Sequence, residues 1–136
     1  MRHLAFVLGC TLLISAGAAS AQPKDSGEWA GVWQGQLDGQ PSVILTLAED
    51  TGELGGTVVL NIISREGGQP QVVAREPHVL VRPRVETNKL SFELMRINKS
   101  DAPMNFTVVF TSEGRAQIHC LNCGADAPIV DLVKEH

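Results

Sequence analysis

The sequence predicts an all-β domain, an eight-stranded antiparallel up-and-down barrel with no substantial helix outside its N-terminal segment. The chain has 136 residues, 43% hydrophobic and 19% charged, which suits one small folded domain and is too apolar for disorder. Its apolar residues recur with a period of two in short runs, which is typical of strands. Turn-forming residues, among 13 Gly and 7 Pro, separate those runs.

The first 21 residues are predicted to be a signal peptide rather than part of the fold. A basic start at Arg2 precedes an apolar run at 4–14, and Ala19-Ser20-Ala21 is an A-x-A cleavage site. We therefore expect a mature chain that is periplasmic or secreted, with a short linker at 22–28 and a barrel domain at 29–136. Lipid attachment at Cys10 is the alternative, but cleavage there leaves only a short apolar core.

Eight runs of alternating apolar and polar residues predict eight strands. The first places Trp29 and Trp33 on one face, with glycines between them. Glu76-Pro77 interrupts the fourth run, so we expect an edge or a bulge there. The short connections leave no room for a crossover helix, so neighbouring strands should be antiparallel. The expected strands are 29–37, 42–48, 53–64, 71–82, 89–97, 104–110, 115–121 and 128–134.

Short, sequential connections favour a closed barrel over a sandwich, with a split or flattened barrel as the nearest alternative. The predicted inner face is almost wholly apolar. Its expected members are Trp33, Leu45, Val58, Leu60, Val79, Val81, Leu90, Phe92, Phe106, Val108 and Ile118.

Alternate connections of an up-and-down barrel fall at the same end. Those at 38–41, 65–70, 98–103 and 122–127 are mostly longer than the intervening turns. Because loops on a rigid scaffold commonly carry binding sites, we expect any open mouth at that end.

Basic side chains gather on the fourth and fifth expected strands. Placing Arg84 opposite Lys89 would pair Val81 with Phe92 and direct the basic residues outward, with Glu86 and Glu93 as counter-charges. A solvated outer face is the first interpretation of this group, and a patch for an anionic partner is the alternative. The group comprises Arg75, Arg82, Arg84, Lys89 and Arg96.

One short motif resembles a known family. Gly31-Val32-Trp33 resembles the G-x-W of calycin-type barrels, the lipocalins and avidins, and the run 29–37 followed by 54–57 is similar to small exported bacterial barrels of unknown function. The resemblance implies that Trp33 closes one end of a barrel beneath a basic residue, Lys134 or else Arg115. Biotin sites of the avidin type use several Trp and a Tyr, and this chain has no Tyr, so biotin is not expected.

Cys120 and Cys123 would be the cysteines of the mature chain, an even pair at the end of a strand. Export favours a structural disulfide between them, because a turn brings its ends within bonding range. A redox-active C-x-x-C is a second interpretation, although no helix follows to stabilise a thiolate. A metal site that includes His119 is a third, but a fourth ligand is missing.

Several function classes are not expected. A net charge of −4 argues against general nucleic-acid binding, and the absence of an apolar run of 18 residues argues against a membrane span. Neither G-x-S-x-G nor H-E-x-x-H is present. We therefore predict no catalytic residue, no metal site and no cofactor.

Three functions then compete. The first is an exported binding module for a small apolar ligand or peptide at the long-loop mouth, with Trp29, Trp33, Phe92 and Phe106 as candidate ligand contacts. The second is a protein-interaction barrel, an inhibitor or accessory subunit that uses its loops or outer face. The third is a redox protein centred on Cys120 and Cys123.

Overall fold

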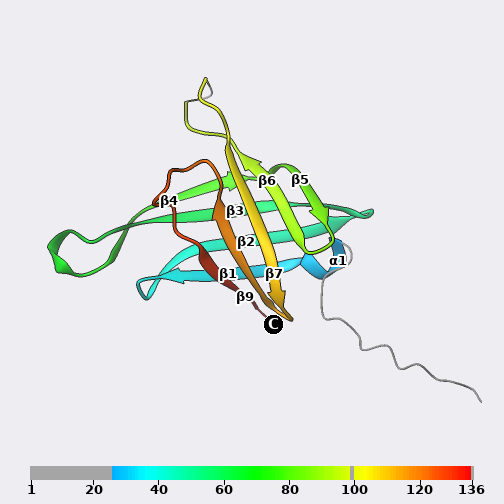
Figure 1. Cartoon of the computed structure of the whole chain (residues 1–136), viewed down its shortest axis with the longest axis horizontal. Coiled ribbons are helices and arrows are strands. Elements are labelled where there is room, and N and C mark those ends of the chain that lie inside the picture. Colours follow the sequence, from blue (N-terminus) through cyan, green and yellow to red (C-terminus); the bar gives the residue numbers. More distant parts are fainter. Residues whose placement is uncertain (1–25, 99, 136) are drawn as a thin grey trace, which may run out of the picture.

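The computed structural model describes residues 26–98 and 100–135 as an all-β fold (Figure 1). The predicted signal peptide at 1–21, Cys10 and most of the linker lie outside the described residues. The strands are β1 (Gly31–Leu37), β2 (Gln40–Asp50), β3 (Glu53–Ser64), β4 (Gln71–Val79), β5 (Val81–Glu86), β6 (Lys89–Leu94), β7 (Met104–Ser112), β8 (Arg115–Cys120) and β9 (Val130–Lys134). Two short helical turns accompany them, α1 (Ser26–Trp29) and η1 (Glu66–Gly68).

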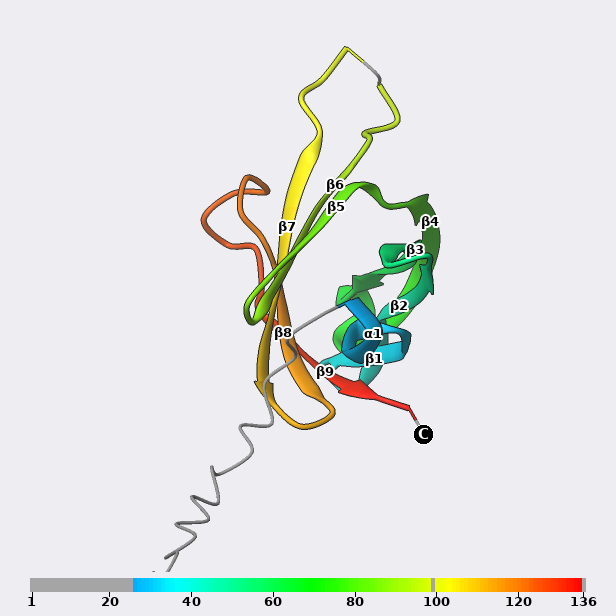
Figure 2. The same cartoon turned by 90° about the vertical axis from the view of Figure 1, so that its right-hand side faces the viewer.

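All nine strands belong to one antiparallel sheet, in the order β4-β3-β2-β1-β9-β8-β7-β6-β5. The first and last strands pair, so the meander runs outward from β1 and β9 to its two edges. The sheet curls until its β1–β4 half faces its β5–β9 half (Figure 2). The predicted up-and-down order is confirmed, but the sheet is a curled half-barrel in which β4 and β5 form no ladder.

The count of nine corrects the expected eight, because the run 71–82 divides at Leu80. The Leu80 N–H donates to the Gly56 carbonyl at 3.0 Å, and two residues later Arg82 has a φ of 48°. This break redirects the chain from one edge of the sheet to the other. The expected edge near Pro77 is therefore present, but it is followed by a second strand.

The same break changes the register expected for the next hairpin. Glu86 pairs with Lys89 and Arg84 pairs with Ser91, so the expected pairing of Arg84 with Lys89 is wrong. The register shifts between Val81 and Arg84, where a bulge takes up extra residues. Arg82 and Arg84 nonetheless point outward, as expected.

The core lies between the two halves of the sheet. The expected inner-face residues are buried or partly buried, with one exception: Val79 is 70% exposed because it ends an edge strand beside the break. The residues that fill the interior are Trp29, Trp33, Val43, Leu45, Leu47, Leu54, Val58, Leu80, Leu90, Phe92, Leu94, Phe106, Val108, Phe110, Ala116, Ile118, Cys120, Val130 and Leu132.

Candidate functional site

The connections between strands differ in length at the two ends of the sheet. Two-residue turns at 51–52, 87–88 and 113–114 lie on the side of α1, which we call the tight-turn side. Connections at 65–70, 95–103 and 121–129 emerge from the other side, the long-connection side (Figure 1). The turn at 38–39 also lies there, but it is shorter than expected because Asp38 and Gly39 both take positive φ, as in a type I′ turn.

A cluster of aromatic rings closes the tight-turn side. Trp29 ends α1 rather than beginning a strand, and its ring centroid lies 5.8 Å from that of Trp33 and 6.1 Å from that of Phe110. The Trp33 indole Nε1 donates to the Trp29 carbonyl at 2.9 Å, so its polar atom is satisfied inside the core. The cluster therefore acts as a plug.

Lys134 lies over this plug from the last strand. Its Nζ is 5.7 Å from the centroid of the Trp33 ring and 3.1 Å from the Glu28 carbonyl. A Cβ on Gly31 would come within 2.8 Å of the Lys134 side chain, and Gly31 has a φ of 134°. The lysine side chain could move away from such a Cβ, but the positive φ favours glycine at this position. Lys134, rather than Arg115, has the position that the family resemblance implied.

The four candidate ligand contacts are all buried. Trp29 and Trp33 belong to the plug, while Phe92 and Phe106 stack in parallel on β6 and β7 with centroids 5.5 Å apart. The fold thus separates them into two groups. Phe92 and Phe106 also contribute to the lining of an open depression on β6 and β7, whereas Trp29 and Trp33 have no exposed surface. The role of all four in binding stays a prediction.

Polar contacts hold the long connections in two pairs. The Arg65 guanidinium forms an ion pair with the Asp38 carboxylate, which joins the β3–β4 connection to the β1–β2 turn. The Asn122 side chain accepts from the Asn105 N–H at 2.8 Å and donates to the Pro103 carbonyl at 2.9 Å. The expected single mouth is therefore divided into two groups of loops.

The cysteines lie beside the second of these pairs. Cys120 and Cys123 are joined by a disulfide, with their Cα atoms 5.5 Å apart, as export and spacing predicted. Asn122 lies inside the four-residue loop that the disulfide closes, which holds the amide where it meets the neighbouring connection. Holding Asn122 in this position is a structural role for the disulfide, and it requires no redox activity of the cysteines.

Exposed apolar side chains are concentrated on the long-connection side. Ten large hydrophobic residues are exposed within 26–98 and 100–135, and seven of them lie on these connections or on the strand ends that lead into them. They are Ile62, Val72, Val73, Met95, Ile97, Leu121 and Ile129.

The β4 edge combines this apolar surface with free backbone. Residues 71–75 are exposed on both faces of the strand, and Val73 is the extra residue of a bulge between Val72 and Ala74. Because the Leu80 N–H points to β3, alternation directs the Arg75 N–H and the backbone nitrogen of residue 77 outward. Residue 77 is proline, so it blocks pairing at that point while 71–75 stays open.

The sequence pattern does not mark this edge as a site. The signals available were Glu76-Pro77 and the succession Val72-Val73-Ala74, which breaks strict alternation. Nothing in that pattern showed that the hairpin projects beyond the body of the sheet, which is plain in Figure 1.

Three further observations bear on function. No group of three or more His, Cys, Asp or Glu side chains in the described part of the chain is arranged to hold a metal ion. Of the helices within residues 26–98 and 100–135, none has the length and apolar character needed to cross a membrane. Comparisons of the chain with models of protein families, with curated proteins and with solved structures find no match.

Proposed function

We propose that this chain is an exported binding module that takes an extended apolar segment of a partner protein along the free edge of β4. The observation that carries the proposal is the exposure of residues 71–75 on both faces at an edge of the sheet. A partner strand there would bond to the outward backbone groups of β4. Its side chains would cover Ile62, Val72 and Val73.

Both edge strands of the sheet contain a proline, and the position of that proline favours β4 over β5 as the docking strand. β5 carries Pro83 and, beside it, the positive φ of Arg82, so only its last three residues form an uninterrupted edge. β4 carries Pro77 near its C-terminal end, which leaves the six residues 71–76 without proline. Main-chain bonds would supply affinity, and the exposed valines would select apolar side chains.

Selection from a displayed library of random extended peptides tests this proposal, with the mature protein as bait. We expect selected peptides to be rich in apolar residues at alternate positions. Arg75→Pro should weaken their binding at least about tenfold, or about 1.4 kcal/mol, because it removes an outward donor. Arg75→Ala should change it much less.

Two further variants locate the surface. Val73→Ser should weaken peptide binding, while Val133→Ser, a matched change on the exposed outer face of β9, should leave it unchanged. Equal binding by Arg75→Pro and Arg75→Ala would exclude strand addition. Equal losses in Val73→Ser and Val133→Ser would exclude the β4 edge.

A small apolar ligand in the interior is the second candidate. The Trp29 indole N–H favours it, because this buried donor has no hydrogen-bond partner among the described residues. A ligand that carries one acceptor would satisfy it, and the unpaired seam between β4 and β5 would be its entrance. Native mass spectrometry of the purified protein should then reveal an added mass that Trp29→Phe loses, and its absence from the unaltered protein would exclude this candidate.

A further inference from the structure

The outer face of the β5–β8 half carries a row of polar side chains at directly opposed positions. Arg84 pairs with Ser91, Ser91 with Thr107, and Thr107 with His119. The residues that flank Ser91, Thr107 and His119 along the strands are buried, and those that flank Arg84 are partly buried, so these four side chains share the outer face. Directly opposed residues have Cβ atoms roughly 4.5–5.5 Å apart, so an arginine side chain can reach across one neighbour to the next.

Three members of this row line an open depression of about 380 Å³. These three are Arg84, Ser91 and Thr107, and the lining also includes Asn105, Leu121, Phe92 and Phe106. The remaining polar lining is an ion pair between Arg82 and Glu93. The depression thus presents a guanidinium, two hydroxyls and an amide on rigid strands rather than on loops.

The charges in this depression favour an anion. The Glu93 carboxylate is neutralised by Arg82, while Arg84 has no ion-pair partner in the part of the chain that the structure describes. A guanidinium offers several donors in a planar fork that matches the oxygens of phosphate, sulfate or carboxylate. Hydroxyls from Ser91 and Thr107 would donate to the remaining oxygens.

Leu121 adds an apolar contact at the same place. Its side chain is 60% exposed, and its N–H donates to the Asn105 carbonyl at 2.7 Å, which fixes it against β7. The adjacent disulfide limits the movement of the turn that begins there. An exposed leucine beside a free guanidinium suits a ligand with an anionic head and an apolar substituent.

We propose that this depression binds an oxyanion ester, a phosphate or sulfate group attached to an apolar moiety. Arg84, Ser91 and Thr107 hold the oxyanion, and Leu121 packs against the substituent. The site lies on the opposite half of the sheet from the β4 edge and does not depend on the function proposed above.

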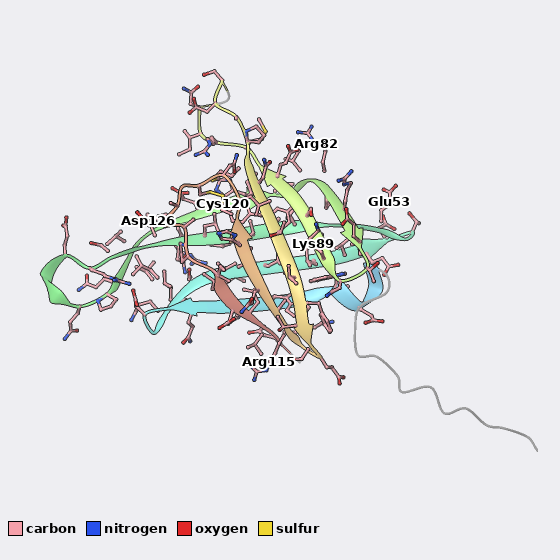
Figure 3. The ribbon with its side chains drawn as sticks, in the orientation of Figure 1. Glu53, Arg82, Lys89, Arg115, Cys120 and Asp126 are labelled. Carbon is pink, nitrogen blue, oxygen red and sulfur yellow. A yellow bond between two sulfur atoms is a disulfide. The ribbon has the colours of Figure 1, made fainter. Side chains whose placement is uncertain are left out.

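Calorimetric titration with phenyl phosphate and with inorganic phosphate tests the site. Phenyl phosphate should bind more tightly, and Arg84→Gln should weaken both ligands at least about tenfold. Arg115→Gln is the matched control, since Arg115 lies at the far end of β8 from this depression (Figure 3). It should bind both ligands like the unaltered protein.

Two other variants separate the parts of the site. Leu121→Ser should abolish the preference for phenyl phosphate over inorganic phosphate and leave inorganic phosphate binding unchanged. Glu93→Gln should strengthen both, because it removes the one carboxylate in the lining and releases Arg82. Equal losses in Arg84→Gln and Arg115→Gln, or weaker binding in Glu93→Gln, would overturn the proposal.

The source of the anion is decided by a vesicle experiment. Flotation with phosphatidylglycerol vesicles, compared with pure phosphatidylcholine vesicles, detects a lipid headgroup. If the protein binds phosphatidylglycerol vesicles and Arg84→Gln abolishes that binding, the ligand is a lipid headgroup. If the protein binds phenyl phosphate but not the vesicles, the ligand is a free ester. Binding of neither ligand to the unaltered protein would exclude the site.

Discussion

The tight-turn side and the long-connection side are made from the same strands, but they place their apolar residues differently. On the tight-turn side, Trp29, Trp33 and Phe110 are buried, Lys134 lies over the Trp33 ring, and two-residue turns join the strands. On the long-connection side, apolar side chains such as Ile97, which is 91% exposed, face solvent. Stability should therefore depend on the first side and recognition on the second.

This contrast has a physical cause. A short turn adds few residues beyond the core, so most apolar side chains near it pack inward, although Val109 and Val133 stay exposed on the outer face of their strands. A long connection leaves residues with no neighbour to cover them, and their backbone groups are satisfied by a few side chains such as Asn122. Surface of that kind is retained at a cost to solubility, which is why its concentration on one side indicates a binding role.

Trp33→Ala should have the largest effect. It removes a buried indole and its hydrogen bond to Trp29, so we expect the free energy of unfolding to fall by about 3–5 kcal/mol. Ile97→Ala should change it by less than about 0.5 kcal/mol. Urea denaturation monitored by circular dichroism measures both, and a loss below about 1 kcal/mol for Trp33→Ala would contradict the buried plug.

Gly56→Ala should come next. A Cβ at Gly56 would lie 1.9 Å from the Thr46 carbonyl oxygen, so the β2–β3 ladder near the tight turn at 51–52 has to move. We expect a loss of about 1–3 kcal/mol. Gly55→Ala is the matched control, since a Cβ there meets nothing within 4 Å. Similar thermal midpoints for the two variants would show that this ladder tolerates displacement.

Loss of the disulfide should have a smaller and more local effect. In Cys120→Ser/Cys123→Ser, a four-residue loop is no longer closed, which costs at most about 2 kcal/mol. Hydrogen exchange should quicken at Asn105, whose N–H depends on Asn122, and stay slow at Leu45 in the core. Faster exchange at both positions would mean that the long-connection side supports the whole fold.

Arg65→Ala should have the smallest effect. The ion pair with Asp38 is largely exposed, so its loss should cost less than about 1 kcal/mol, and less still at high salt. Denaturation at low and high ionic strength measures this difference. A loss above about 2 kcal/mol would place the tip of the β3–β4 hairpin within the cooperative core.

The sequence by itself determined the fold class, most strand positions and much of the core. Alternation at Leu45, Val58 and Val108 survives in the structure because an inward residue of a two-faced strand stays inward in any register that keeps that face toward the core. The disulfide could also be predicted from the sequence, since a turn holds two cysteines three residues apart within bonding distance. These features depend on local spacing.

Tertiary structure alone decided the rest. The run 71–82 divides at Leu80 because the chain there stops pairing with β3 and begins to pair with β6. Val79 is exposed as a result. The polar row from Arg84 to His119 exists only because three separate registers align four residues that are distant in sequence. Periodicity reports which face a residue occupies, whereas the residue opposite it, and the surface they form together, are set by how the strands pack and where the sheet stays open.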